Sequence, residues 1–411
     1  MQRYLIKAKN DIFNEKIRLA SSKSESNRAL IINALSGFSG ELENLSTARD
    51  TQTMIRLLES DDAVADVLDA GTTMRFLTAY FAATNQSKTM TGTPRMCQRP
   101  IGILVDALRT IGAEIDYLDQ AGFPPHKING LPSQKSNTIE IRGDVRSQYI
   151  SALLMIAPVL PQGLTIKLTG EIGSIPYIKM TIRQMEAFGV KVEEDWDEKT
   201  LKVAPQKYHA AHYKIESDWS GASYWYAVVA LAQNTEVKIE LLGLKENSLQ
   251  GDSSIAEIMS HLGVKSTFTS EGVLLEKIQA KSSFEWDFTN CPDLAQTVAV
   301  VLGAKGIKGK FTGIESLKIK ETDRVFALQE ELAKINASLI ETLPNTVYEI
   351  TGRGNWENVP EIETYDDHRM AMAFAPLAMI KEVIIKEPGV VAKSYPSYWE
   401  DLSKVAEIEE I

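Results

Sequence analysis

The chain has 411 residues, of which 44% are apolar and 24% charged, and its net charge is −11. The length exceeds what one hydrophobic core usually holds, so we expect two domains of an ordinary globular protein. The acidic balance argues against a nucleic-acid-binding protein, and the longest apolar run, Tyr149–Leu160, is too short to span a membrane.

The first 20 residues predict a β-hairpin. Two extended runs, Tyr4–Lys9 and Lys16–Leu19, flank the polar turn Asn10–Glu15. The N-terminus contains charges throughout, which is not the pattern of a secretory signal. The chain has only two cysteines, Cys97 and Cys291, too few for a disulfide framework. We therefore expect a reducing, cytoplasmic location.

A polar cluster with an aspartate, followed by a long apolar helix, recurs along the chain. The aspartates are Asp69, Asp144, Asp218, Asp293 and Asp367. Successive aspartates are 75, 74, 75 and 74 residues apart. A sixth copy, Ser22–Leu30, lies 47 residues ahead of Asp69, and its Arg28 aligns with Arg75. A fixed period indicates repeated supersecondary structure. Capping of a helix N-terminus is a sufficient role for most of the five aspartates.

A second helix in each repeat ends at a residue that tolerates positive φ, and a strand-like alternation follows. The predicted helix ends are Leu104–Ile111 before Gly112, Met180–Phe188 before Gly189, Ile258–Leu262 before Gly263, and Leu328–Ile335 before Asn336. The predicted strands are Ala113–Tyr117, Val190–Glu193 and Val264–Phe268. The sequence therefore predicts an α/β fold of six repeats, each strand–helix–strand–helix–strands.

The two ends of the chain predict how the repeats are grouped. The repeat that starts at Asp367 has room for a second helix near Pro396–Ile408, but the chain stops at Ile411 without closing strands. We expect the N-terminal hairpin to complete this last repeat. One domain would then be discontinuous, residues 1–19 plus 218–411, and the other continuous, residues 20–217. Two crossings between the domains favour hinge closure on a ligand.

Basic residues gather near the predicted helix starts despite the acidic balance. They are Lys23, Arg28, Arg75, Arg99, Arg146, Lys320, Arg324, Arg369 and Lys393. A helix N-terminus exposes N–H groups and attracts anions, and arginine binds phosphate or carboxylate with two parallel hydrogen bonds. The set predicts a small, highly anionic substrate. Taken singly, each residue could equally belong to a solvated helix cap, and spacing alone does not say which aspartate is catalytic.

Seven segments, in order between Leu19 and about Leu402, together resemble the EPSP synthase family of enolpyruvyl transferases. They are Lys23–Leu30, Asp69–Arg75, Pro94–Pro100, Ser147–Tyr149, Ile319–Arg324, Asp366–Met372 and Ala392–Ser394. The strings Lys-Glu-Thr-Asp-Arg (320–324) and Asp-His-Arg-Met-Ala-Met (367–372) are the most specific. The resemblance implies the inverse βαβαββ repeat fold, with three repeats per domain and the site in the cleft between the domains.

The resemblance also implies a reaction and its catalytic residues. Shikimate 3-phosphate and phosphoenolpyruvate would give 5-enolpyruvylshikimate 3-phosphate and phosphate. This chemistry needs a base for the 5-hydroxyl and an acid for the enol carbon C3. By similarity Asp293 is the base, Glu321 is the acid, and Lys23 contacts both substrates and shares in proton transfer.

The binding residues are carried over from the same resemblance. The set implied for phosphoenolpyruvate is Lys23, Gly71, Arg99, Gln148, Arg324, Arg369 and Lys393. The set implied for shikimate 3-phosphate is Lys23, Ser24, Arg28, Ser147, Gln148, Ser174, Tyr177, Asp293 and Lys320. No metal or organic cofactor is implied, a monomer is expected, and glyphosate should compete for the phosphoenolpyruvate pocket.

Three positions depart from the family pattern. Asp69 stands where many relatives have asparagine, and we interpret it as a helix cap turned away from the anion site. Arg146 stands in place of a serine, and we hypothesise that it adds a contact to the shikimate phosphate. Ser316 replaces an asparagine that contacts the shikimate ring, so we leave it out of the site.

Three other functions are compatible with related folds. A UDP-N-acetylglucosamine enolpyruvyl transferase would need a loop cysteine near a Pro-Gly-Asp sequence, and Cys97 lies in a different context. An RNA 3′-phosphate cyclase would need a nucleophilic histidine, and only His368 lies within a site motif. A non-catalytic binding protein would not need Asp293, Lys320 and Glu321 together. We prefer EPSP synthase activity to all three.

Overall fold

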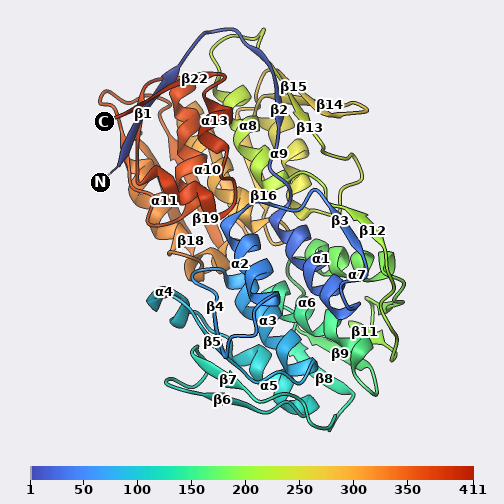
Figure 1. Ribbon diagram of the computed structural model, residues 1–411. Helices are drawn as coiled ribbons and strands as arrows, with labels where there is room; N and C mark the ends of the chain where they lie inside the picture. Colours follow the sequence, from blue (N-terminus) through green and yellow to red (C-terminus); the bar gives the residue numbers. More distant parts are fainter. Residues whose placement is uncertain (1) are drawn as a thin grey trace. The chain divides into compact units, whose positions relative to one another are not determined.

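The computed structural model describes residues 2–411, which form two units with separate hydrophobic cores. The discontinuous unit comprises Met1–Ser22 and Glu216–Ile411, and the continuous unit comprises Lys23–Ile215. Both units contain strands and helices in alternation (Figure 1).

The continuous unit contains seven α-helices among the described residues: α1 (Lys23–Leu35), α2 (Arg49–Leu58), α3 (Gly71–Ala83), α4 (Pro94–Cys97), α5 (Gly102–Ile111), α6 (Ser147–Ile156) and α7 (Ile175–Ala187). Its strands are β3 (Glu41–Glu43), β4 (Val64–Asp66), β5 (Lys88–Thr91), β6 (Ile115–Tyr117), β7 (His126–Ile128), β8 (Thr138–Arg142), β9 (Leu164–Thr169), β10 (Glu193–Asp195), β11 (Thr200–Val203) and β12 (His212–Lys214). One 3-10 helix, η1 (Ala157–Val159), follows α6.

The discontinuous unit begins with β1 (Arg3–Ala8) and β2 (Asn14–Arg18). Its other strands are β13 (Lys238–Leu242), β14 (Val264–Phe268), β15 (Gly272–Lys277), β16 (Ser283–Asp287), β17 (Lys308–Thr312), β18 (Ala337–Leu343), β19 (Val347–Gly352), β20 (Glu361–Ile362), β21 (Val383–Lys386) and β22 (Ala406–Glu410). Its α-helices are α8 (Trp219–Leu231), α9 (Ile255–Leu262), α10 (Ala295–Lys305), α11 (Arg324–Ala333), α12 (His368–Phe374) and α13 (Tyr398–Leu402). Its 3-10 helices are η2 (Gly251–Ser254), η3 (Pro292–Leu294), η4 (Glu315–Ile319), η5 (Ala375–Met379) and η6 (Pro388–Lys393).

Five four-stranded sheets within residues 2–411 share one strand order. The continuous unit has β4-β5-β7-β6 and β8-β9-β11-β10, and the discontinuous unit has β2-β13-β15-β14, β16-β17-β19-β18 and β20-β21-β1-β22. In each sheet the first pair is parallel and the other pairs are antiparallel. A parallel pair needs a crossover, which a helix supplies. The predicted strand–helix–strand–helix–strands repeat is confirmed.

The sixth repeat is shorter, which explains the 47-residue spacing at the N-terminal end. Its sheet contains only β12 and β3, paired in parallel. After α2 the chain enters β4 of the next repeat, without a closing pair of antiparallel strands of its own.

The prediction of an N-terminal hairpin that completes the last repeat is right only for β1, which joins the sheet of that repeat, while β2 pairs into a different sheet. The expectation that the chain stops without a closing strand is wrong, because β22 follows α13. Strand β1 lies between β21 and β22 and is antiparallel to both, so neither of its edges is open to β2. Strand β2 pairs in parallel with β13, more than two hundred residues further along the chain. Figure 1 shows the connection between β1 and β2 as a long passage and not as a tight turn.

The first helices of the repeats are buried around nearly their whole circumference. Helices α1, α3 and α6 contact one another in the continuous unit, and α8, α10 and α12 do so in the discontinuous unit. In α10 only Lys305 is not fully buried, as expected for a helix that is apolar all round.

The predicted ends of the second helices are confirmed, since Gly112, Gly189, Gly263 and Asn336 all have positive φ. The strand predicted at Val190–Glu193 is wrong, because β10 begins only at Glu193.

Only two of the five repeat aspartates cap a helix, so the sequence overestimated this role. Asp218 accepts a hydrogen bond from Ser220 N, and Asp367 accepts one from Arg369 N, both at 2.9 Å. Asp69 and Asp144 instead pair with arginines, and Asp293 joins the charge cluster described below.

Every helix within residues 2–411 is too short or too polar to cross a bilayer.

The buried His126 should make stability fall in mild acid. Thr78 Oγ1 donates to Met74 O, so it accepts its 3.0 Å bond from His126 Nε2–H of a neutral ring. Burial, and secondarily the charge of Arg109, lowers the pKa of His126 from 6.5 to about 4. The unfolded chain therefore binds the proton more tightly, and the stabilisation present above pH 6.5 is lost as pH falls towards 4.

We expect protonation of His126 to lower the free energy of unfolding by about 3 kcal/mol over this pH range. His126→Gln retains a donor for Thr78 but does not titrate. Urea unfolding between pH 7 and pH 4 should show a shallower pH dependence in the variant. Parallel curves for the two proteins would show that His126 is not the titrating group.

Candidate active site: two clusters of charged residues

The first cluster lies in the discontinuous unit and is centred on Asp293, in the 3-10 turn η3 just before α10. Arg324 Nη1 lies 2.9 Å from Asp293 Oδ1, Arg369 Nη2 lies 3.0 Å from Oδ2, and Lys320 Nζ lies 3.4 Å from Oδ1. Both carboxylate oxygens of Asp293 therefore have cationic partners.

Arg324 joins the predicted base to the predicted acid. Its Nη2 lies 2.8 Å from Glu321 Oε2, while Nη1 contacts Asp293. Its Nε donates to Asp367 Oδ2 at 2.6 Å, and Asp367 is fully buried. The planar guanidinium thus holds three carboxylates in fixed directions. Arg324 is the first residue of α11, whose N-cap Asp323 accepts a bond from Phe326 N, so the helix start fixes its backbone.

The electrostatics of this cluster keep Asp293 ionised. Burial opposes its charge, but Arg369, Lys320 and Arg324 outweigh burial and hold the pKa of Asp293 well below its usual range. In the same way, Asp367, Glu321 and Asp293 raise the pKa of Arg324 despite burial. An aspartate held in this state is a weak base until its cationic partners are drawn away.

Two further acidic groups border the cluster. Lys393, which the resemblance assigns to phosphoenolpyruvate, lies 3.0 Å from Asp366 Oδ2 and donates to Asp366 O at 2.6 Å. Asp252 is buried and accepts a hydrogen bond from Ser220 Oγ. Burial and the nearby charge of Asp293 raise the pKa of Asp252 to about 6. The cluster therefore contains one carboxylate whose pKa is lowered and one whose pKa is raised.

The second cluster lies in the continuous unit, at the starts of α1, α3 and α6. Lys23, the first residue of α1, places Nζ 2.9 Å from Asp50 Oδ2 on α2. Thr73 Oγ1 donates to the backbone oxygen of Asp50 at 3.2 Å, which ties α3 to the same point. The predicted catalytic lysine is therefore oriented by a carboxylate that the sequence did not indicate.

Gly71 is packed against two guanidinium groups. A Cβ built on Gly71 would lie 2.7 Å from Arg99 Nη2 and 2.8 Å from Arg75 Nη1, so only glycine fits without moving them. Arg75 Nη1 donates to Gly71 O at 2.6 Å and to Gln148 Oε1 at 3.2 Å. Gln148 Nε2 in turn donates to Thr72 Oγ1 at 2.8 Å. The structure thus brings together three of the predicted residues, Gly71, Arg99 and Gln148.

Arg28 forms a separate buried group. It donates to Thr181 Oγ1 at 2.8 Å, to Ser24 O at 2.9 Å and to Ser151 Oγ at 3.3 Å. Its guanidinium carbon lies 5.9 Å from the Tyr177 ring centroid, and burial lowers its pKa to about 10. The group includes three residues implied for shikimate 3-phosphate.

Two other predicted residues lie at helix starts of the same unit. Ser147 is the first residue of α6, and Ser174 is the N-cap residue of α7 with φ +54°. A non-glycine residue in this left-handed region is uncommon and often marks a functional position.

The interpretation of Asp69 as a helix cap is wrong. The N-cap of α3 is Ala70, and Asp69 instead accepts bonds of 3.0 and 2.8 Å from Arg49 Nη2. The arginine neutralises the extra charge that departs from the family pattern. Arg146 is the N-cap residue of α6 and makes no side-chain cap hydrogen bond, and Ser316 lies in η4. The hypothesis that Arg146 contacts a phosphate stays a prediction.

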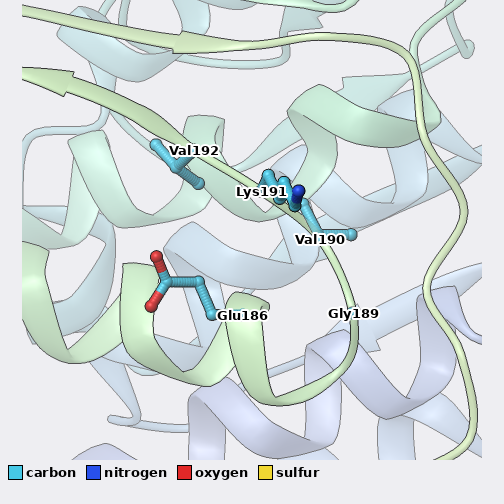
Figure 2. A pocket seen from close by; sticks show the side chains of 5 residues that line it. All are labelled: Glu186, Gly189, Val190, Lys191 and Val192. Atoms are coloured by element: carbon cyan, nitrogen blue, oxygen red, sulfur yellow. The ribbon is translucent and has the colours of Figure 1, made fainter.

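A shallow pocket of about 470 Å³ lies in the continuous unit, at the C-terminal end of α7. Figure 2 shows its lining, Glu186, Gly189, Val190, Lys191 and Val192. Ser174 and Tyr177 lie at the other end of this 13-residue helix, roughly 20 Å away at 1.5 Å per residue. Within residues 2–411 no group of three or more His, Cys, Asp or Glu side chains is placed to hold a metal ion.

The sequence analysis named Arg75 and Asp367 but included neither among the predicted substrate-binding or catalytic residues, and it did not indicate Asp50 or Asp252. The repeat pattern contains a signal for the first two. Arg75 aligns with Arg28 in the repeat, and Asp367 occupies the repeat position of Asp293. Asp50 and Asp252 lie outside that position, so only the fold reveals their partners.

The whole chain is similar to known proteins. The model of the family EPSP synthase (3-phosphoshikimate 1-carboxyvinyltransferase) matches residues 55–402. A 3-phosphoshikimate 1-carboxyvinyltransferase of Bacteroides fragilis strain YCH46 is 49% identical over 404 residues, covering 98% of this chain and 97% of that protein. One of Enterobacter sp. strain 638 is 35% identical over 419 residues, covering 95% and 96%. A solved EPSP synthase structure from Acinetobacter baumannii has a TM-score of 0.75 at 19% identity, with full coverage of both chains, and shows the fold.

The two free thiols should differ sharply in reactivity. Cys291 is 2% exposed, and burial together with the charge of Asp252 raises its pKa to about 12. Cys97 is half-buried at the end of α4. We expect Ellman's reagent to label one thiol in the native protein and both in guanidinium chloride. The variant Cys97→Ser should lose the native signal, and retention of that signal would mean that Cys291 is accessible.

Proposed function

The chain belongs to the EPSP synthase family, and we propose that the two clusters of charged residues carry out the family's chemistry. The enzyme transfers the enolpyruvyl group of phosphoenolpyruvate to the 5-hydroxyl of shikimate 3-phosphate and releases phosphate. The observation that carries the assignment of roles is the single Arg324 guanidinium, which contacts both Asp293 and Glu321.

The reaction proceeds by addition and elimination. The 5-hydroxyl oxygen attacks C2 of phosphoenolpyruvate while C3 gains a proton, which gives a tetrahedral intermediate. Loss of a proton from C3 then expels phosphate. In our assignment Asp293 accepts the hydroxyl proton and Glu321 supplies the proton to C3. In the free protein, the shared contact with Arg324 places the two carboxylates beside the same guanidinium, before the exchange of partners described next.

Asp293 has to exchange partners before it can act as a base. Arg324 and Arg369 contact its carboxylate in the free protein, and both belong to the set implied for phosphoenolpyruvate. The phosphate and carboxylate of that substrate compete for the same N–H donors. Once the arginines bind the substrate, Asp293 loses cationic partners and becomes more basic. Substrate binding would thus activate the base.

The remaining roles are assigned within each unit. In the continuous unit we assign Gly71, Arg99 and Gln148 to phosphoenolpyruvate, and Ser24, Arg28, Ser147, Gln148, Ser174 and Tyr177 to shikimate 3-phosphate. In the discontinuous unit we assign Arg324, Arg369 and Lys393 to phosphoenolpyruvate, and Lys320 to shikimate 3-phosphate. Lys23 would contact both substrates, and its contact with Asp50 supports a fixed ammonium position.

We further propose that the enzyme is a cytoplasmic monomer without a cofactor. Both cysteines are free, which is compatible with a reducing compartment. The nucleotide-sugar and RNA alternatives are not favoured, because the curated relatives named above are 3-phosphoshikimate 1-carboxyvinyltransferases over nearly their whole length.

The assigned reaction is tested by measuring phosphate release from phosphoenolpyruvate with one acceptor at a time. We expect release with shikimate 3-phosphate and none with UDP-N-acetylglucosamine, because the curated relatives act on the former. Release only with the nucleotide sugar would replace the acceptor. Release with neither would leave an anion-binding protein without this activity.

The partner exchange at Asp293 is tested by Asp293→Asn. We expect kcat to fall roughly 10²- to 10⁴-fold, the usual range for loss of a general base. We also expect phosphoenolpyruvate to bind the free variant about tenfold or more tightly, since the arginines have lost a competing anion. Isothermal titration calorimetry measures this affinity.

The matched control is Asp144→Asn, the same change at the equivalent repeat position, where the carboxylate pairs with exposed Arg142. This variant should retain the wild-type affinity and rate. Unchanged or weaker binding by Asp293→Asn would show that Asp293 does not compete with the substrate.

A further inference from the structure

Arg75 is a fully buried arginine whose partners are all neutral. Its exposed fraction is 1%. The guanidinium donates to the backbone oxygen of Gly71 and to Gln148 Oε1, and its carbon lies 5.3 Å from the Tyr149 ring centroid. Its Nε is buried with no hydrogen-bond partner among the described residues. No Asp or Glu of residues 2–411 forms an ion pair with it.

The other unit shows the usual arrangement for such a charge. Arg324, equally buried, contacts carboxylates of Asp293, Glu321 and Asp367. A buried charge without a compensating anion is strongly unfavourable, and proteins normally avoid it. Arg75 is therefore a charge that the free protein leaves uncompensated, at the start of α3 and α6, where N–H groups also favour an anion.

The contacts of Arg75 determine the geometry of two predicted substrate-binding residues. Because Arg75 donates to Gln148 Oε1, the Gln148 amide must direct Nε2 towards the opposite side, where it donates to Thr72 Oγ1. The same Nη1 holds the backbone of Gly71, against which Arg99 also packs. Without Arg75, the Gln148 amide could rotate and the second guanidinium beside Gly71 would be missing.

We propose that Arg75 is a positioning residue for the phosphoenolpyruvate-binding residues Gly71 and Gln148, and that the bound anion supplies the counter-charge that Arg75 lacks. The identity of the anion rests on the proposed function. The charge of Arg75 would attract an anion bound beside Gly71 and Gln148. The N–H donors of its guanidinium fix the orientation of these two residues.

The alternative is that Arg75 only joins α3 to α6. The two roles predict different results for a charge-removing and a charge-conserving substitution. Arg75→Gln retains N–H donors but no charge, and Arg75→Lys retains the charge but not the fork. A joining role would lower the melting temperature of both variants and leave their anion affinity unchanged.

The experiment measures binding of inorganic phosphate and of phosphoenolpyruvate to the full chain, by ligand-dependent melting temperature and by calorimetry. For Arg75→Gln we expect affinity for both anions to fall about tenfold or more, and for Arg75→Lys a smaller loss. The KM for phosphoenolpyruvate should rise in parallel, and the KM for shikimate 3-phosphate should rise less, because Gln148 is only one of the several residues assigned to that substrate. Wild-type anion affinity in Arg75→Gln would overturn the proposal.

Arg109→Gln is the matched control. Arg109 likewise donates to a backbone oxygen, that of Ile115, and lies 4.9 Å from the Tyr117 ring centroid, yet it contacts no predicted site residue. Its removal should leave anion affinity unchanged. If both Arg75 variants fail to fold, the Nε–H signal of Arg75 in the ¹⁵N-labelled wild-type protein decides. A shift that saturates with phosphoenolpyruvate supports the proposal, and an unchanged signal overturns it.

These measurements separate this inference from the assigned reaction. Anion binding and melting need no turnover, so they test Arg75 even if the wild-type protein releases no phosphate with shikimate 3-phosphate. Conversely, normal turnover in wild-type protein together with unchanged anion affinity in Arg75→Gln would reject the role of Arg75 and leave the reaction in place.

Discussion

The Arg324 guanidinium is the interaction on which the charged cluster of the discontinuous unit depends. It is 2% exposed and contacts Asp293, Glu321 and Asp367, the last of which is fully buried. Removal of this one cation would leave a buried carboxylate without its ion-pair partner, at a cost of several kcal/mol. The same loss would free the predicted base and acid to move apart. Stability and chemical geometry are therefore coupled through one side chain.

The two units use buried arginines in opposite ways. In the discontinuous unit, carboxylates of the protein occupy Arg324 and Arg369, so an incoming anion has to displace Asp293. In the continuous unit, Arg75 contacts only neutral groups and has nothing to release. Competition at one cluster and a missing counter-charge at the other both favour a doubly anionic substrate. Both arrangements provide N–H donors and positive charge for an anion.

Sequence periodicity predicted the helix starts and helix ends because these depend on local chemistry, such as positive φ at Gly112 or Asn336. It failed where the partner is distant in sequence. Strand β2 follows β1 closely, and a local rule favours a hairpin, but the open edge that β2 completes belongs to β13. Arg75 was visible as a basic residue, yet the neutrality of its surroundings is a tertiary property. The family resemblance indicated which residues bind substrate, and the fold shows which neighbouring side chains hold those residues in place.

The difference between Asp293 and the two capping aspartates at this repeat position follows from where the helix begins. Asp218 and Asp367 stand directly before α8 and α12, so their carboxylates bind the free N–H groups of those helices. Helix α10 begins two residues after Asp293, because Pro292 opens a 3-10 turn first and Leu294 becomes the N-cap residue. The Asp293 carboxylate is therefore not bound to the start of α10, and it reaches Arg324 and Arg369 instead. A later helix start releases the aspartate from capping, and nearby arginines then become its partners: Arg49 for Asp69, and Arg324 and Arg369 for Asp293, the proposed base.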